Sequence, residues 1–204
     1  MDSTDFWFAI CDCSQNKNCN FGTLTRQQMK KLLLVVVATM MVCMAFAQDQ
    51  KVYENGYLVK TGDSAPDFTV REAGGKTYTL ADLRGKVVML QFTASWCGVC
   101  RKEMPFIEEE IWLPGKEKGL VVIGIDRDEP EPTVLKFRDD MRITYPLALD
   151  PGADIFGLYA QKEAGVTRNV IIDRKGRIIF LTRLFEREEF DRMKEVIFSE
   201  LAKK

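Results

Sequence analysis

The hydrophobic pattern along most of the chain consists of short apolar runs separated by amphipathic stretches. Nearly continuous apolar runs at 86–92 and 119–126 are typical of strands buried on both faces. Amphipathic stretches at 97–111 and 131–141 follow them, and a short strand leads into another helix within 145–160. Because strand and helix alternate, the pattern predicts a parallel sheet joined by helical crossovers.

The two ends of this pattern are different. Two β-branched runs flank the turn from Asp173 to Gly176, which predicts an antiparallel hairpin before an amphipathic helix from about Glu186 to Ala202. At the other end, a short strand at 68–70 precedes a helical turn that begins at Thr79, with Asp82 in the capping-box position. The whole pattern predicts one α/β domain with a mixed sheet.

The helix expected to begin near Cys97 is amphipathic. Its apolar residues recur at spacings of three and four, and three consecutive glutamates are expected to face water. The apolar positions are Val99, Met104, Phe106, Ile107 and Ile111, and the glutamates are Glu108, Glu109 and Glu110.

An export signal precedes the domain. Two lysines follow Met29, and sixteen uncharged residues from Leu32 to Ala47 come next. Ala45 and Ala47 supply the small residues of a cleavage site, so the mature chain is expected to begin at Gln48. An uncleaved membrane anchor is the alternative, although a spanning helix needs about 20 apolar residues.

This interpretation places the protein in the periplasm or otherwise outside the cytoplasm. A polar lead before the basic residues is unusual in exported chains, which makes Met29 the expected initiator. The chain then divides into an untranslated or disordered lead at 1–28, a signal peptide at 29–47, a linker at 48–59 and the α/β domain at 60–204.

Charge and composition exclude several functions. Lys and Arg total 29 against 30 Asp and Glu, so the net charge of -1 offers no general field for nucleic acid or an anionic membrane. The chain has no histidine, which excludes Cys-His and Ser-His nucleophilic pairs and removes the commonest zinc nitrogen ligand. We therefore expect no metal, no cofactor and no nucleic-acid partner.

The six cysteines reduce to one pair of interest. Cys11, Cys13, Cys19 and Cys43 lie before the domain, and only Cys97 and Cys100 fall within it. A structural zinc site would need four ligands, and a purely structural bridge that closes so short a loop would stabilise little. Thiol-disulfide exchange is the interpretation that remains once these two alternatives are weighed.

The positions of Cys97 and Cys100 suit this exchange. A strand that ends near Phe92 and a helix that begins near Cys97 put the Cys97 sulfur at a helix N-terminus, where the helix dipole lowers the thiol pKa below about 8.5. Cys100 lies one turn further on the same face and can attack a mixed disulfide formed at Cys97. Cys97 is therefore the expected nucleophile.

The segment "GKVVMLQFTASWCGVCRKEMP" resembles the active-site segment of the thioredoxin superfamily, and specifically the exported TlpA/ResA-like thiol-disulfide oxidoreductases. The similarity extends to "APDFTV", "GVTRNVIIDRKGRI" and the last helix, over about 140 residues. It implies a thioredoxin-like three-layer sandwich: a mixed central sheet with flanking helices, an N-terminal extension and a central insertion.

The resemblance also implies roles for single residues. Trp96 would pack beside the dithiol and shape the docking surface, with simple core packing as its alternative. Glu103 would assist proton transfer at the second cysteine, with a solvated surface acid as its alternative. Gln91 stands where ordinary thioredoxins carry a buried aspartate, which favours Glu103 as the acid-base group.

One position departs from the family pattern. The family places a cis-proline opposite the cysteines, and this chain has Thr167 there, after Val166. Substrate binding by Val166 and Thr167 is what the family implies. Because a cis bond without proline costs about 2.5 to 4 kcal/mol, the bond between them is expected to be trans or strained. Peroxiredoxin-like relatives also lack the proline and keep a nearby arginine, a position that Arg168 could fill.

The sequence predicts a disulfide reductase that contributes to redox homeostasis. Val99 cannot stabilise a thiolate as the histidine of strongly oxidising exported enzymes does, so a low potential is expected. The implied partners are exported proteins or cytochrome c cysteines as substrates and a membrane thiol-transport protein as electron donor, with the protein itself a monomer. A thiol-dependent peroxidase with antioxidant activity and a non-catalytic binding protein with a vestigial dithiol are the alternatives.

Overall fold

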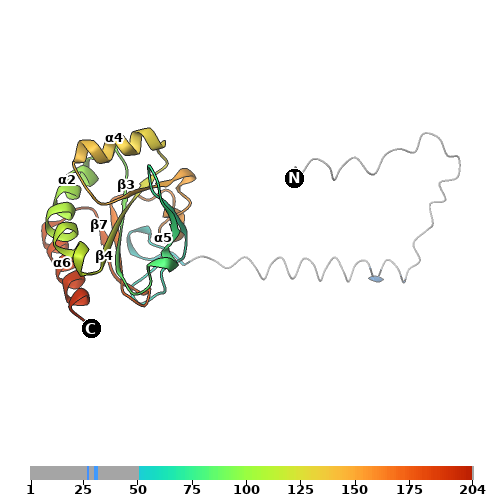
Figure 1. Cartoon of the computed structure of the whole chain (residues 1–204). Helices are drawn as coiled ribbons and strands as arrows, with labels where there is room; N and C mark the ends of the chain where they lie inside the picture. Colours follow the sequence, from blue (N-terminus) through green and yellow to red (C-terminus); the bar gives the residue numbers. More distant parts are fainter. Residues whose placement is uncertain (1–26, 28–29, 32–50, 204) are drawn as a thin grey trace. The chain divides into compact units, whose positions relative to one another are not determined.

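The structure is a computed structural model that describes residues 27, 30–31 and 51–203 (Figure 1). Contacts divide the chain into Met1–Asp49 and Gln50–Lys204, and the second unit is the one described below. Nearly all of the expected lead and signal peptide lies outside the described residues, as do Cys11, Cys13, Cys19 and Cys43. Within the described residues, no helix has both the length and the apolar composition needed to cross a membrane.

A five-stranded mixed sheet forms the centre of the folded unit, in the order β5-β4-β3-β6-β7. Strands β3, β4 and β5 are parallel, whereas β6 runs antiparallel to β3 and β7 runs antiparallel to β6. The predicted parallel sheet and C-terminal hairpin are therefore confirmed. The strands are β3 (Val87–Thr93), β4 (Leu120–Arg127), β5 (Leu147–Asp150), β6 (Arg168–Ile172) and β7 (Ile178–Arg183).

The remaining elements follow the predicted order closely. Thr79 and Asp82 form both hydrogen bonds of the predicted capping box at the start of η2. A small separate sheet pairs β1 (Thr69–Arg71) with β2 (Thr77–Thr79). The helices are η1 (Glu54–Gly56), η2 (Leu80–Leu83), α2 (Gly98–Phe106), η3 (Ile107–Trp112), α3 (Leu113–Gly115), η4 (Lys116–Lys118), α4 (Glu131–Met141), η5 (Pro151–Ala153), α5 (Phe156–Tyr159) and α6 (Arg187–Ala202).

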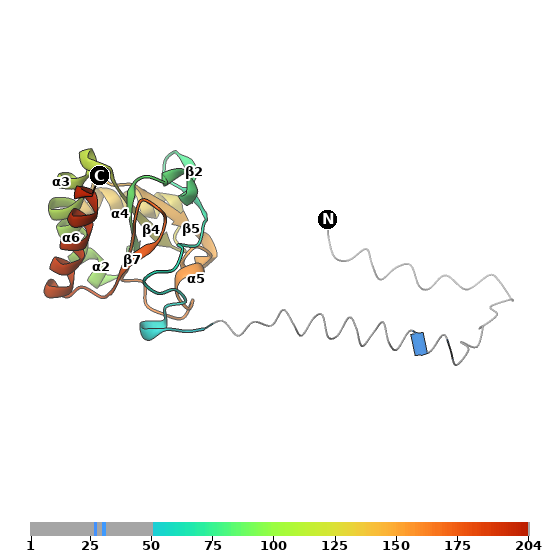
Figure 2. The same cartoon turned by 90° about the horizontal axis from the view of Figure 1, so that it is seen from below.

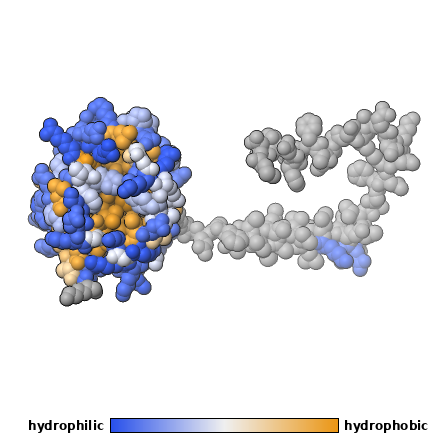
Figure 3. Space-filling model, in the orientation of Figure 1, coloured by the Kyte–Doolittle hydropathy of each residue, from blue (hydrophilic) through white to orange (hydrophobic). Residues whose placement is uncertain are grey.

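The sheet has two apolar faces, each covered by a different layer. Alternate residues of β3 point to opposite faces: Met89 packs with α2, α4 and α6, whereas Leu90 packs with α5 and the β1-β2 region. Figure 2 shows α6 on one side of the sheet and α5 and β2 on the other. This is the three-layer arrangement of the thioredoxin fold. On the outer surface, Figure 3 shows hydrophobic residues gathered in the middle of one face between hydrophilic margins.

The expected orientation of Glu108 is wrong, because this residue borders the buried face of the helix, four residues after Met104 and three before Ile111. Residues Ile107–Trp112 form a π-helix, in which each turn holds one more residue than an α-turn. Glu108 points inward, and its carboxylate accepts hydrogen bonds from the backbone N–H of Thr144 (2.8 Å) and from its hydroxyl (2.6 Å). Glu109 remains exposed as expected, while Phe106, expected among the apolar positions, is 37% exposed.

The segment expected as a linker contributes to the core at its end. Tyr57 and Val59 are buried, and the Tyr57 hydroxyl donates a hydrogen bond to the Thr182 carbonyl at 2.5 Å. The Arg168 guanidinium lies over the Tyr57 ring, 4.5 Å from its centroid. The packed domain therefore reaches further toward the N-terminus than residue 60.

Candidate active site

Cys97 and Cys100 are joined by a disulfide at the start of α2, with 5.3 Å between their Cα atoms. Cys97 is the N-cap residue of α2, and its sulfur accepts a hydrogen bond from the backbone N–H of Cys100 at 3.2 Å. The predicted position of Cys97 at a helix N-terminus is thus confirmed. Cys97 is 8% exposed and Cys100 is fully buried, so the exposed part of the pair belongs to Cys97.

The turn before Cys97 is held from two sides. Glu129, after β4, accepts hydrogen bonds at 2.6 Å from both the backbone N–H and the hydroxyl of Ser95. Arg101 of α2 donates to the Ser95 carbonyl at 3.1 Å, and the Cys97 N–H donates to the Ala94 carbonyl at 3.1 Å. These bonds fix how β3 turns into α2 and hence where the Cys97 sulfur lies.

Thr167 lies directly against the disulfide. Its hydroxyl oxygen is 3.1 Å from the Cys97 sulfur and 3.3 Å from the Cys100 sulfur. The Val166–Thr167 peptide bond is trans, which agrees with the absence of proline at this position. The chain therefore presents a hydroxyl to both sulfurs at the point where the family presents a proline ring.

Glu103 is buried on the same side of α2 as Cys100. It is 2% exposed, which contradicts the alternative of a solvated acid. Its Oε1 accepts a hydrogen bond from the Asn169 side-chain amide at 2.6 Å, and Asn169 pairs with Gln91 across β3 and β6. Burial raises the pKa of Glu103 to about 7, opposed by the amides of Asn169 and Gln91 and reinforced by the charge of Glu189.

The surface around Cys97 carries exposed apolar side chains. Trp96 is 66% exposed, which contradicts the alternative that it is a core residue. Leu184 is 43% exposed, and its N–H donates to the Thr167 carbonyl at 3.0 Å. The exposed Trp96 therefore adjoins Cys97 along the chain, and the backbone of the exposed Leu184 pairs with that of Thr167.

A second buried acid lies at the end of β4. Asp126 is fully buried, and neither of its carboxylate oxygens has a hydrogen-bond partner within the described part of the chain. It pairs with Thr93, the last residue of β3. Burial raises the pKa of Asp126 to about 8, together with the nearby charges of Glu129 and Asp150, which act in the same direction.

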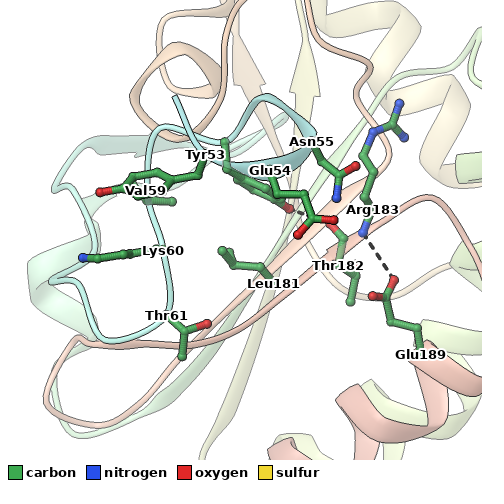
Figure 4. A pocket seen from close by; sticks show the side chains of 11 residues that line it. Tyr53, Glu54, Asn55, Val59, Lys60, Thr61, Leu181, Thr182, Arg183 and Glu189 are labelled. Carbon is green, nitrogen blue, oxygen red and sulfur yellow. Dashed lines mark hydrogen bonds between the residues drawn. The ribbon is translucent and has the colours of Figure 1, made fainter. Parts of the chain in front are cut away.

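A cavity of about 500 Å³ opens beside β7, on the outer edge of the sheet. Figure 4 shows its lining, with Leu181 on the floor and Glu189 approaching the backbone of Arg183. Thr182 lines the cavity and also receives a hydrogen bond at its hydroxyl from Asn169 (2.9 Å), the partner of Glu103. Neither cysteine lines this cavity. Among the described residues, no three His, Cys, Asp or Glu side chains gather as metal ligands.

Several contributors to the site could not be named from the sequence. Asn169, Thr182 and Glu129 act through contacts between distant segments, and Leu184 reaches Thr167 only through the fold. One signal was present: Gln91 is an isolated polar residue inside the apolar run 86–92, which is typical of a buried strand, and Asn169 directly precedes the apolar residues 170–172. Polar groups at such positions need partners, so each could have been paired with an acid from the facing helix.

Comparisons with known proteins agree with this geometry. The model of the AhpC/TSA family matches residues 61–181. Thiol-disulfide oxidoreductase ResA of Bacillus cereus is 35% identical over 151 residues, covering 73% of this chain and 86% of the relative.

Two solved structures are also similar over the folded unit. The solution structure of a candidate protein disulfide isomerase from Bacteroides thetaiotaomicron has 59% identity and a TM-score of 0.71, covering 72% of this chain and 94% of that one. The crystal structure of a candidate thiol:disulfide interchange protein DsbE from Chlorobium tepidum has 28% identity and a TM-score of 0.63, covering 71% and 99%. With its dithiol, fold and relatives in agreement, the chain belongs to the AhpC/TSA family and, within the thioredoxin superfamily, to the TlpA/ResA-like thiol-disulfide oxidoreductases.

Proposed function

We propose that the protein is a disulfide reductase that acts on exported proteins and so contributes to redox homeostasis. The observation that carries the proposal is the asymmetry of the pair: Cys97 caps α2 and keeps 8% of its surface exposed, whereas Cys100 is fully buried. Dithiol exchange requires this arrangement: an accessible thiolate attacks the client disulfide first, and a shielded thiol then attacks the mixed disulfide.

The exchange proceeds in two displacements. The Cys97 thiolate attacks one sulfur of the client disulfide, and the other client sulfur leaves as a thiolate. Cys100 then loses its proton and attacks the Cys97 sulfur, which forms the Cys97–Cys100 disulfide and releases the second client thiolate. Two electrons pass to the client, and a membrane thiol-transport protein returns two electrons to the pair.

Substrate docking is assigned to the apolar surface around Cys97. Trp96, Val166 and Thr167 are the proposed substrate-binding residues; Trp96 is exposed, whereas Val166 and Thr167 are 2% and 3% exposed, and the backbone of the exposed Leu184 pairs with Thr167. Exposed apolar side chains on a soluble domain favour contact with the apolar residues of an unfolded polypeptide. Client proteins with exposed cysteines, including exported proteins and cytochrome c before haem attachment, fit such a surface.

Export is supported by the pattern of residues 29–47, two lysines, an apolar run and a small-residue cleavage site. On this proposal the mature chain begins at Gln48 and acts in the periplasm as a monomer; without cleavage, the same segment would anchor it to the membrane. Mass spectrometry of the protein recovered from its native cells tests this, since an N-terminus before Met29 would contradict it.

The reductase assignment is tested by a redox titration together with insulin reduction. We expect a midpoint potential nearer to roughly -270 mV than to roughly -120 mV, and precipitation of insulin in the presence of a thiol donor. A potential above about -150 mV would show a net oxidant and overturn the assignment.

Peroxidase activity is the second candidate, because the AhpC/TSA match and the absence of proline at position 167 both favour it. The position of Arg168 argues against peroxide binding by this residue. Arg168 is 1% exposed, and its guanidinium donates hydrogen bonds to the backbone carbonyls of Asn55 and Gly165. Consumption of hydroperoxide at the expense of a thiol donor, lost in Cys97→Ser, would establish this second activity.

Glu103 is proposed to accept the proton of Cys100 in the second displacement. Because the pKa of Glu103 is about 7, the carboxylate that acts as base is present above that pH and lost below it. We expect Glu103→Gln to slow the decay of the mixed disulfide by about 10²-fold and to remove its rise with pH near 7. Stopped-flow measurement of this decay across pH checks the prediction, with Glu109→Gln on the exposed side of the helix as the matched control.

A further inference from the structure

Three arginines from three different strands hold the loop that carries Thr167. This loop, residues 162–167, is the end of the connection from α5 to β6. Arg127 of β4 donates to the carbonyls of Lys162 and Ala164, the latter at 3.0 Å. Arg168 of β6 donates to the Gly165 carbonyl at 2.9 Å, and Arg183 of β7 donates to the Thr167 carbonyl at 3.3 Å. Four carbonyls of one short loop are thus bound by guanidinium groups.

Two of these arginines are themselves fixed by aromatic rings. The Arg127 guanidinium lies 4.7 Å from the centroid of Phe156, and that of Arg168 lies 4.5 Å from the centroid of Tyr57. Stacking restricts a planar guanidinium more than it would a lysine ammonium, so the donors are held in place before the loop is bound. Side chains from other strands therefore restrict the backbone of this loop, whereas a proline would restrict it through its own ring.

The Thr167 hydroxyl is the group that this rigidity places. It lies 3.1 Å from the Cys97 sulfur and 3.3 Å from the Cys100 sulfur. Both sulfurs are in a disulfide and carry no proton, so the hydroxyl is the donor in these contacts. A thiolate is a far better acceptor than a disulfide sulfur, because hydrogen bonds to ionised groups are roughly twice as strong as those between neutral groups.

We propose that the Thr167 hydroxyl is a catalytic hydrogen-bond donor to the Cys97 thiolate, and that Arg127, Arg168 and Arg183 are the residues that position it. When two electrons from the thiol donor cleave the disulfide, Cys97 becomes a thiolate and Cys100 takes up a proton. The thiolate then receives two hydrogen bonds, one from the Cys100 N–H and one from Thr167, while the threonine proton stays on its oxygen. This proposal rests on the dithiol exchange of the proposed function and not on its direction.

Thr167→Val and Thr167→Ser test the hydroxyl directly. Valine keeps the branched shape and removes the donor, whereas serine keeps the donor. We expect Thr167→Val to lower the fraction of Cys97 present as thiolate about tenfold at a given pH, because the hydrogen bond that it removes stabilises the charged form of the sulfur. The midpoint potential should become about 30 mV more negative, because a tenfold change in the equilibrium constant corresponds to that value. Thr167→Ser should remain within about twofold of the wild type.

Thiolate formation is followed by ultraviolet absorbance and by the pH dependence of alkylation at Cys97, in the reduced protein. An unchanged thiol pKa in Thr167→Val, or an equal change in Thr167→Ser, would overturn the proposal. These titrations need no client, so a failure of insulin reduction would count against the reductase assignment and leave this test intact. Thermal unfolding of the oxidised variants confirms that each one is folded.

Arg183→Ala separates positioning from a direct effect of charge. Removing this guanidinium should lower the thiolate fraction about threefold, in the same direction as Thr167→Val. If Arg183 acts through Thr167, the double variant Arg183→Ala/Thr167→Val should match Thr167→Val alone. Additive effects would show that the arginine acts on Cys97 through its charge, and would overturn its positioning role.

Discussion

Cys97→Ser is expected to abolish disulfide exchange, with a loss of insulin reduction of at least about 10³-fold. A serine hydroxyl at the α2 N-terminus stays protonated at neutral pH and cannot form a mixed disulfide. Cys100 cannot replace it, because its sulfur is fully buried behind Cys97. The rate is measured as insulin precipitation with excess thiol donor, against the same donor without protein.

Cys100→Ala should fail at the following step and so identify the order of attack. The first displacement still occurs at the partly exposed Cys97, but no second thiol is present to release the client. We expect one client to accumulate per protein as a mixed disulfide, visible on a non-reducing gel and by mass spectrometry. Cys97→Ser/Cys100→Ala is the matched control and should capture nothing.

Two results would contradict this scheme. A mixed disulfide on Cys100 in Cys97→Ser would reverse the roles of the two sulfurs. Normal function of the Cys97→Ser/Cys100→Ser protein in its cells would favour a binding protein with a vestigial dithiol. The variants in both experiments are expected to stay folded. A bridge between residues so close in sequence removes little conformational entropy from the unfolded chain and so contributes little to stability.

Features that depend on neighbours in the sequence were predictable. The Thr79–Asp82 capping box, the placement of Cys97 before α2 and the span of α4 all follow from residues within one or two turns of each other. The strands were equally clear, because runs such as 86–92 are apolar enough to be buried on both sides. Local chemistry therefore indicates the fold and the two reactive sulfurs.

Features that depend on distant contacts were not predictable. Glu108 lies four residues after Met104 and three before Ile111, at the border of the buried helix face, and its partner Thr144 comes from the segment between α4 and β5. The partner of Glu103 comes from β6, and the arginines that hold residues 162–167 come from three strands. Such partners emerge when the sheet is assembled, so one sequence shows at most an isolated polar residue that needs one.

Asp126→Asn is expected to stabilise the oxidised protein, and the gain should depend on pH. Asp126 is buried without a hydrogen-bond partner in the described part of the chain, and its pKa is raised from 3.8 to about 8. Between these two values the unfolded chain is ionised and the folded protein holds a proton. The free energy of unfolding therefore falls as pH rises through this range, and it levels off above about pH 8.

The asparagine amide is neutral at every pH and removes this penalty, and the nearby Glu129 and Asp150 carboxylates can accept its N–H bonds. We expect a gain of about 2 to 4 kcal/mol near pH 7.5 that shrinks below about 1 kcal/mol near pH 4. Asp139→Asn is the control, because it makes the same charge change on a side chain that is 74% exposed. Denaturant unfolding at several pH values measures both variants. A gain that does not vary with pH, or one matched by the control, would show that Asp126 is already ionised in the folded protein.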